Sequence, residues 1–247
     1  MNYYGKTDRG LVREQNQDCV FYDANLKDQV IAVVADGMGG HKAGEIASKA
    51  VTNYIANYFN ATPPFQNGQE ALAFIEDAIT KSDEVVKKMA QTNSEHRGMG
   101  TTIAMAVAIK NQIHIAHVGD SRAYLFDGTS LEQVTSDHTL VNELVRTGAI
   151  SVEEAKNHSK KHVLYQAIGA SEKIEAAIAT HDFTNRMCLL CSDGLYNCVE
   201  DRDIIKILKS KNKLPAKVEQ LIKKANLNGG YDNISVCLID NLEVVHD

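Results

Sequence analysis

Hydrophobic residues in the first third of the chain follow two different patterns. Residues 30–35 form a continuous apolar run rich in β-branched side chains, which favours a buried strand that leads straight into a turn at Asp36 and Gly37. Residues 43–60 and 68–90 instead repeat their apolar positions at helical spacing, and Pro63-Pro64 separates the two segments. The pattern predicts a strand followed by two amphipathic helices.

The middle of the chain changes to a period of two. Residues 101–109, 112–118 and 123–126 have the pattern of strands, and Lys110-Asn111 and Asp127-Gly128 are typical turn sequences between them. Because the three segments follow one another so closely, we expect them to form an antiparallel meander.

The last part of the chain mixes both kinds of element. Residues 140–155 predict short helices, and Ser151, Glu153 and Glu154 resemble a capping box at the start of the second. The remaining elements are a strand at 186–191, helices at 201–208 and 215–225, and a strand at 234–240. Strands that cluster apart from paired helices indicate an α+β layered domain.

Composition narrows the class of protein. The chain has 247 residues, 44% hydrophobic and 23% charged, so we expect a single domain over residues 1–247. A net charge of -6 provides no basic surface for nucleic acid. Five cysteines, mostly inside apolar runs, indicate a reducing compartment and no disulfide framework. Without an apolar leader or a spanning run, we expect a cytoplasmic protein with no membrane partner.

Aspartates recur where hydrophobic runs end. Four stand beside a glycine or an asparagine, and a fifth follows a polar stretch; they are Asp36, Asp120, Asp193, Asp232 and, fifth, Asp18. A carboxylate between a buried strand and a turn is held rigidly yet open to solvent, which suits hard divalent cations. Each aspartate taken alone is more often a turn or cap residue. If they converge, their mutual repulsion calls for a metal ion between them.

Other catalytic sites find little support. The glycine-rich segment from Gly37 to Gly40 is either a simple turn or a place where the backbone approaches a ligand closely, with the Gly37 carbonyl available to a cation. It lacks the glycine spacing of a nucleotide-binding loop. No cysteine has the arginine six residues later that a cysteine phosphatase needs. Cys188 and Cys191 have zinc half-site spacing, yet they lie in a predicted buried strand, which favours a core role.

Six short motifs follow one another along the chain: TDRGLVREQNQD at 7–18, ADGMGGH at 35–41, GMGTT at 98–102, VGDSR at 118–122, SDGL at 192–195 and GGYDN at 229–233. In this order they resemble the bacterial branch of the protein phosphatase 2C (PPM) family. The resemblance covers residues 2–240. It implies a four-layer α/β/β/α sandwich, in which helix pairs flank two antiparallel sheets, and manganese- or magnesium-dependent hydrolysis of phosphoserine and phosphothreonine.

The resemblance also assigns roles to residues. Asp36 would bridge two ions, Gly37 would ligate through its carbonyl, and Asp193 and Asp232 would complete the first ion. Asp18 would help to hold the second ion, and Asp120 matches the ligand of a third, weaker one. A hydroxide that bridges two ions would attack phosphorus in line, with no covalent enzyme intermediate.

Two further residues are expected to contact the substrate. Arg13 matches the family's phosphate-binding arginine, whose planar fork can hold two phosphate oxygens. His41 would either protonate the leaving alkoxide or only touch the substrate, because this chain has Met38 where animal members carry a histidine. Gln17 replaces a glutamate of other members and removes one charge from the site.

A flap is expected over residues 137–169. Its basic residues form either a surface for phosphopeptides or a solvated loop; they are His158, Lys160, Lys161 and His162.

We therefore expect a monomeric phosphatase that acts on phosphorylated proteins and opposes a bacterial serine/threonine kinase. Two alternatives remain: a catalytically silent phosphoprotein-binding module on the same fold, and a hydrolase of small phosphate esters.

Overall fold

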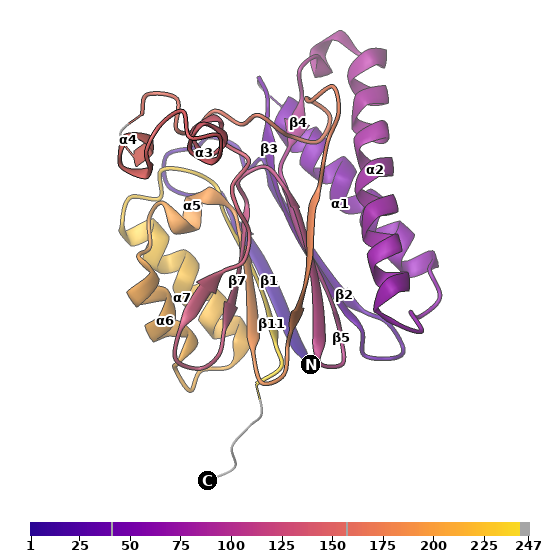
Figure 1. Ribbon diagram of the computed structural model, residues 1–247, viewed down its shortest axis with the longest axis vertical. Helices are drawn as coiled ribbons and strands as arrows, with labels where there is room; N and C mark the ends of the chain where they lie inside the picture. The colour runs from indigo at the N-terminus through magenta and orange to yellow at the C-terminus, as the bar shows by residue number, and fades with distance from the viewer. Residues whose placement is uncertain (41, 157, 243–247) are drawn as a thin grey trace.

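Two antiparallel sheets lie face to face at the centre of the molecule, with helices on both outer faces (Figure 1). The computed structural model describes residues 1–40, 42–156 and 158–242. One sheet has the order β1 (Asn2–Asp8), β11 (Ile234–Asp240), β10 (Met187–Cys191), β7 (Arg122–Phe126) and β8 (Leu131–Gln133). The other has the order β2 (Asp18–Ala24), β3 (Val30–Met38), β5 (Ile103–Ile109), β6 (Gln112–Val118) and β9 (Ala177–Asp182), and β4 (Gly100–Thr101) pairs with β3.

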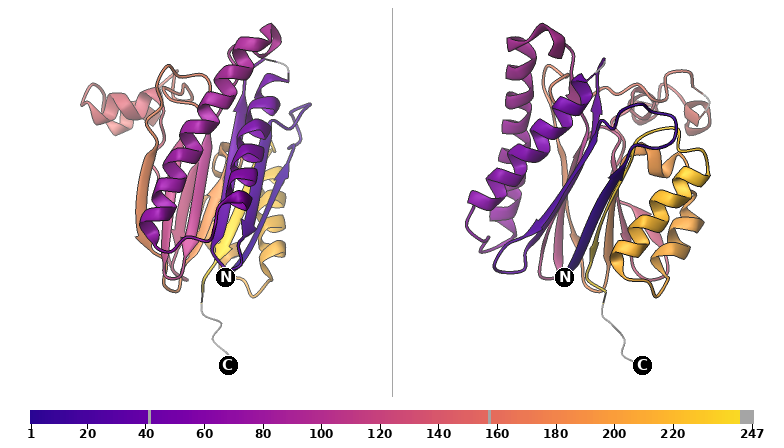
Figure 2. Two further views of the ribbon diagram at one scale, coloured as in Figure 1. Left: turned by 90° about the vertical axis from the view of Figure 1, so that its right-hand side faces the viewer. Right: turned by 180° about the vertical axis from the view of Figure 1, so that it is seen from behind.

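Helix pairs complete the four layers. Helices α1 (Ala43–Ala61) and α2 (Gly68–Thr92) cover the β3 sheet, while α5 (Asp193–Tyr196), α6 (Asp201–Leu208) and α7 (Leu214–Leu227) cover the β11 sheet. The view from behind in Figure 2 (right) shows the same layering. Two short helices, α3 (Leu140–Arg146) and α4 (Val152–Lys156), and the 3-10 turn η1 (Ser94–His96) lie outside the layers. The expected α+β sandwich is confirmed.

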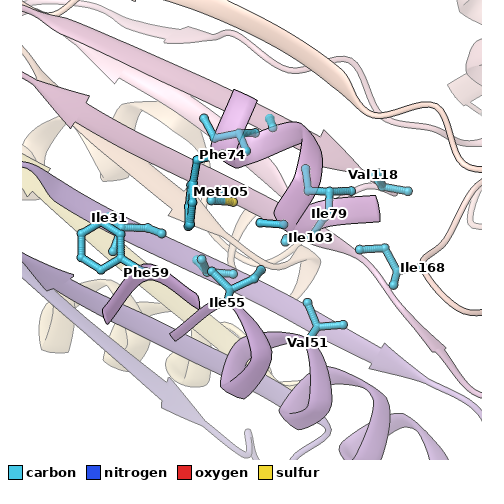
Figure 3. Close-up of a cluster of buried hydrophobic side chains, with 14 of the residues drawn as sticks. Ile31, Val51, Ile55, Phe59, Phe74, Ile79, Ile103, Met105, Val118 and Ile168 are labelled. Atoms are coloured by element: carbon cyan, nitrogen blue, oxygen red, sulfur yellow. The ribbon is translucent and has the colours of Figure 1, made fainter. Parts of the chain in front are cut away.

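Strand alternation divides the core into three hydrophobic clusters. Along β3, Ile31 and Val33 point to α1 and α2, whereas Val30, Ala32 and Val34 point to the opposite sheet. Figure 3 shows the first cluster, where side chains from α1, α2 and the sheet interdigitate. Because β3 is buried on both faces, its sequence is a continuous apolar run.

The meander prediction is wrong for its third strand. Strands β5 and β6 form the expected hairpin, but β7 crosses to the other sheet and pairs with β10 and β8. The crossing follows Gly119, whose φ is +100° and whose Cβ position would lie 2.6 Å from the Thr102 side chain, so only glycine fits there. Strands of the two sheets have the same alternation, so the local pattern could not reveal the crossing.

Several local predictions are confirmed. Both long helices appear, α6 and β11 have the predicted bounds, and Ser151 and Glu154 exchange capping-box hydrogen bonds. All five cysteines are free, and Cys188 and Cys191 are fully buried core residues. Strand β3 is longer than expected: it continues through Asp36 to Met38 because β4 pairs with its end. Among the described residues, no helix is long and apolar enough to cross a membrane.

Candidate active site

One edge of the sandwich is hollowed where strands of both sheets end. The cavity has a volume of about 630 Å³, and its walls include six of the residues singled out in the sequence: Arg13, Asp36, Gly37, Asp120, Asp193 and Asp232. Asp36 and Asp120 belong to the end of β3 and the turn after β6, whereas Asp193 follows β10 and Asp232 precedes β11. The two sheets therefore bring together aspartates that are far apart in the sequence.

Asp18 lies directly behind this cavity. The β2–β3 register places it opposite Asp36, and its side chain is buried. One carboxylate oxygen, Oδ2, accepts a hydrogen bond of 2.7 Å from Ser192 Oγ, which itself accepts one of 2.9 Å from the Ser235 backbone N–H. Ser192 was not predicted from the sequence, although it directly precedes Asp193. Its hydroxyl links Asp18 to the opposite sheet.

The GMGTT segment fixes the backbone of Asp36. Thr101 Oγ1 donates to the Asp36 carbonyl at 2.8 Å, and the Asp36 N–H donates to Thr102 Oγ1 at 3.1 Å. A Cβ on Gly37 would lie 2.1 Å from the Gly44 carbonyl oxygen in α1. Close packing against α1 therefore requires a glycine at position 37. This structural requirement is separate from the ligand role that the resemblance implies.

Burial is the main cause of raised pKa values among the clustered carboxyl groups, and repulsion between them adds to it. Burial raises the pKa of Asp18 to about 7, that of Asp120 to about 7 and that of Asp193 to about 6. It also holds the pKa of Asp36 well above its usual value, and the charge of Asp18 contributes next. The fold therefore concentrates negative charge that a bound cation would stabilise.

The oxygen atoms at this edge suit a hard divalent cation. Asp193 Oδ1 is fully buried and has no hydrogen-bond partner among the described residues, while Oδ2 accepts from Asn197 Nδ2 at 3.1 Å. Such an unsatisfied buried oxygen is unusual and marks the place of a missing partner. Across residues 1–40, 42–156 and 158–242, no three His, Cys, Asp or Glu side chains converge tightly enough to enclose an ion unaided. Magnesium-type ions usually keep several waters and bind one or two carboxylates, so this donor set fits them.

Arg13 stands at the rim of the cavity. Its Nη2 donates to Asp232 Oδ2 at 2.7 Å, and its side chain is 54% exposed. Arg13 therefore combines a positive charge next to the carboxylates with access to solvent.

Asn233 holds the loop that carries Arg13, and the sequence analysis missed this role. Its Oδ1 accepts from the Gln17 N–H at 2.8 Å, and its Nδ2 donates to the carbonyls of Arg9 and Gln15 at 2.8 and 2.9 Å. Asn233 is buried, so these hydrogen bonds clamp both ends of the loop against the start of β11. The available signal was its position directly after Asp232 in GGYDN.

The flap over residues 137–169 is fastened at both ends. Arg122 Nε and Nη2 donate to the two Asp137 oxygens at 2.9 and 2.7 Å, and Asp83 Oδ1 accepts from the Gly169 N–H at 2.7 Å. Between these points, His162 lines the central cavity and also a second one of about 300 Å³, together with Lys161. Of the basic flap residues, His162 thus faces the site and Lys161 lines only the neighbouring cavity, whereas His41 lies outside the described residues.

Comparison with known proteins decides the family. Residues 11–228 match the family model described as protein phosphatase 2C. The chain belongs to that family. It is a protein serine/threonine phosphatase of the bacterial type, as the motifs indicated.

Individual members of the protein phosphatase 2C family agree with the chain over nearly its full length. It is 41% identical to the serine/threonine phosphatase stp of Listeria welshimeri, over 95% of this chain and 94% of that one. The crystal structure of the phosphatase Stp1 from Staphylococcus aureus superposes with a TM-score of 0.89 at 35% identity, covering 96% and 94%. The catalytic domain of PstP, crystallised with two manganese ions, gives a TM-score of 0.83 at 32% identity, covering 98% of both chains.

Proposed function

We propose that this protein removes phosphate from phosphoserine and phosphothreonine in other proteins, with two Mn²⁺ or Mg²⁺ ions bound at the acidic edge. The observation that carries the proposal is the convergence of carboxyl groups with raised pKa values around the buried and unsatisfied Oδ1 of Asp193. The two manganese ions in the PstP crystal structure support the same donor chemistry.

Each carboxylate is proposed to hold a particular ion. Asp36 is proposed to bridge them, with Asp193, Asp232 and the Gly37 carbonyl on one ion and Asp18 on the other. When bound, such ions would supply a water-derived nucleophile near neutral pH, so that no covalent enzyme intermediate is needed. The hydrogen bond from Ser192 keeps Asp18 oriented, and the hydroxyls of the GMGTT segment do the same for Asp36.

Arg13 is proposed to bind the phosphate group of the substrate. Its guanidinium can hold two oxygens, and the clamp at Asn233 fixes the loop from which it projects. The leaving alkoxide needs a proton, for which His41 is the residue proposed from the motif. His162 is a second candidate, because it lines the central cavity. Separate His41→Ala and His162→Ala variants distinguish the two candidates. In the variant that lacks the general acid, the rate should depend more steeply on the pKa of the leaving group.

Asp120 is proposed to hold a third and weaker ion. Burial and then the charge of Asp193 raise its pKa to about 7, although the charge of Arg122 lowers it, so a bound cation would stabilise the negative charge at this position. The Asp120 carbonyl accepts a hydrogen bond of 3.1 Å from Tyr196 O–H, so the turn that carries it is held.

The wider setting is also a proposal. We place the protein in the cytoplasm as a single-domain monomer that opposes a serine/threonine kinase. The five free cysteines support a reducing compartment, and the fold belongs to a family of protein phosphatases.

One set of assays tests the proposed function. Phosphate release is measured from a phosphothreonine peptide and from p-nitrophenyl phosphate, with Mn²⁺, with chelator and in Asp193→Asn. The proposal requires release from the peptide that depends on Mn²⁺ and is lost in the variant. Turnover with chelator would contradict the metal site. Peptide binding without cleavage would favour the binding module, and cleavage of the small ester alone would favour the hydrolase of small esters.

A further inference from the structure

Exposed apolar side chains gather on one side of the central cavity. Four large ones, with exposed fractions between 61% and 74%, form what we call the apolar platform: Leu11, Val12, Leu227 and Tyr231. The backbone N–H groups of Leu11 and Val12 both donate to the Gly230 carbonyl, at 2.8 and 3.3 Å. The N-terminal loop and the segment after α7 therefore lie side by side (Figure 2). Contiguous exposed apolar surface of this kind marks an interaction site.

The apolar platform is continuous with the active site. Tyr231 lines the cavity of about 630 Å³ together with Arg13. Leu11 and Leu227 line a neighbouring hollow of about 520 Å³, whose wall includes Ile222 of α7. The platform thus leads from the proposed phosphate-binding position to a second hollow, whose wall combines three apolar side chains with polar and charged ones.

The rim of this second hollow is charged. Lys6 pairs with Glu219 at 3.4 Å across it, whereas Lys223 is exposed and forms no ion pair with a described residue. In a chain of net charge -6, this lysine is a local positive group beside apolar surface. Asp8 also lines the hollow, so its rim carries two basic and two acidic residues, and its apolar part, formed by Leu11, Ile222 and Leu227, suits an apolar side chain.

Resting on the proposed function, we infer that the apolar platform docks the phosphoprotein substrate. An apolar side chain near the phosphorylated residue would sit in the hollow beside Leu227. The occupant is a substrate because Leu11 lies two positions before Arg13 on the same clamped loop, so a polypeptide whose phosphate reaches Arg13 passes close to the platform. The platform would then favour phosphoproteins over small phosphate esters.

Matched peptides test this inference. A phosphothreonine peptide with serine and glycine flanks is compared with a series in which one leucine is moved within roughly six residues of the phosphothreonine, a reach of about 20 Å in an extended chain. The enzymes are the wild type, Leu227→Ser, the conservative Leu227→Met, and Leu26→Ser. Leu26 is also fully exposed but lies in the β2–β3 turn, away from the platform, and serves as the matched control. p-Nitrophenyl phosphate measures turnover without docking.

The expected result is a position at which leucine raises kcat/KM about tenfold, the scale of burying one such side chain. Leu227→Ser should abolish this gain, while Leu227→Met and Leu26→Ser keep it, and p-nitrophenyl phosphate turnover should stay unchanged in all four. A gain that survives Leu227→Ser, or no gain at any position, overturns the docking inference while the proposed function stands. Wild-type enzyme that cleaves neither substrate refutes the proposed function itself. A dimer in sedimentation velocity that Leu227→Ser dissociates would assign the platform to a second copy instead.

Discussion

Buried carboxylates are treated in opposite ways in two neighbouring regions of this molecule. At the base of the flap, Asp137 is 10% exposed and receives two hydrogen bonds of 2.9 and 2.7 Å from Arg122, which is itself only 23% exposed. Two positions before Arg122, Asp120 belongs to a cluster whose pKa values are raised by burial and repulsion. The fold thus pairs an arginine with a buried carboxylate where the role is structural. Among the described aspartates of the acidic edge, only Asp232 is ion-paired, with Arg13, and the remaining negative charge would be stabilised by a bound cation.

The largest effect should come from neutralising the centre of the acidic edge. We expect Asp36→Asn to reduce phosphopeptide hydrolysis with Mn²⁺ by roughly 10³-fold, which corresponds to about 4 kcal/mol of lost transition-state stabilisation. In chelator, the same change should leave the free energy of unfolding unchanged or raised, because one repelling charge disappears. Urea titration measures the latter. A clear loss of metal-free stability would show that Asp36 is structurally paired and would erase the contrast with Asp137.

Breaking the Arg122–Asp137 ion pair should instead lower the stability of the protein. Arg122→Ala leaves Asp137 buried without its partner, so the free energy of unfolding should fall by about 3 kcal/mol. Asp137→Asn in the Arg122→Ala background should recover part of this loss, because the remaining group is then neutral. The four proteins form a double-mutant cycle in urea. Additive losses would mean that the pair is not coupled.

Removing the hydrogen bonds of Asn233, a neutral residue, should have a smaller effect than the changes at Asp36 or Arg122. We expect Asn233→Ala to lower kcat/KM for a phosphothreonine peptide by about 10- to 100-fold, since Arg13 loses its fixed loop. The free energy of unfolding should fall by about 1–2 kcal/mol, as the backbone groups of Arg9, Gln15 and Gln17 lose their partner. Steady-state kinetics should show the loss mainly in KM. An unchanged KM would contradict the positioning role.

The smallest effect should be a pH dependence at the flap base. Burial lowers the pKa of His138 to about 4, and repulsion by His117 at a ring distance of 4.6 Å contributes, while Asp137 opposes it and Tyr165 packs on the other side. In the unfolded chain the imidazole pKa is about 6.5, so the unfolded state binds more protons between about pH 6.5 and 4. The contribution of His138 to the free energy of unfolding is therefore fully present above about pH 6.5 and is lost as the pH falls towards 4.

Urea unfolding of His138→Phe between about pH 6.5 and 4 measures how much of the pH dependence of the free energy of unfolding comes from this histidine. We expect the variant to lose less stability on acidification than the wild type, by on the order of 1 kcal/mol. Identical pH profiles of the two proteins would remove His138 as the cause.

Local structure was predictable wherever one residue pattern dominates. Helix α6 has a strong helical periodicity and strand β11 is a nearly continuous buried run, and the bounds of both match the prediction. Strands β1, β2 and β9 were missed because they are partly exposed and mix tyrosines or charged residues with apolar ones. The crossing of β7 was missed because strand pairing across two sheets depends on contacts between distant segments.

The candidate site shows the same division. Four of the five aspartates could be recognised in the sequence beside a glycine or an asparagine, but only the sheet topology brings Asp36 and Asp193 to one cavity. From the sequence, this convergence could be expected only through the family motifs. The supporting residues Ser192 and Asn233 escaped notice, because a serine or asparagine beside a catalytic motif has no distinctive pattern until its hydrogen bonds are known.

Manganese binding to metal-free protein tests whether the acidic edge holds two ions. Calorimetric titration of Mn²⁺ at neutral pH is carried out on the wild type, on Asp193→Asn, and on Leu26→Ser as a surface control. We predict binding of two ions to the wild type and the control, with a rise in melting temperature, and loss of at least one ion in Asp193→Asn. Wild-type protein that binds no Mn²⁺, yet hydrolyses the phosphothreonine peptide in chelator, would contradict the account.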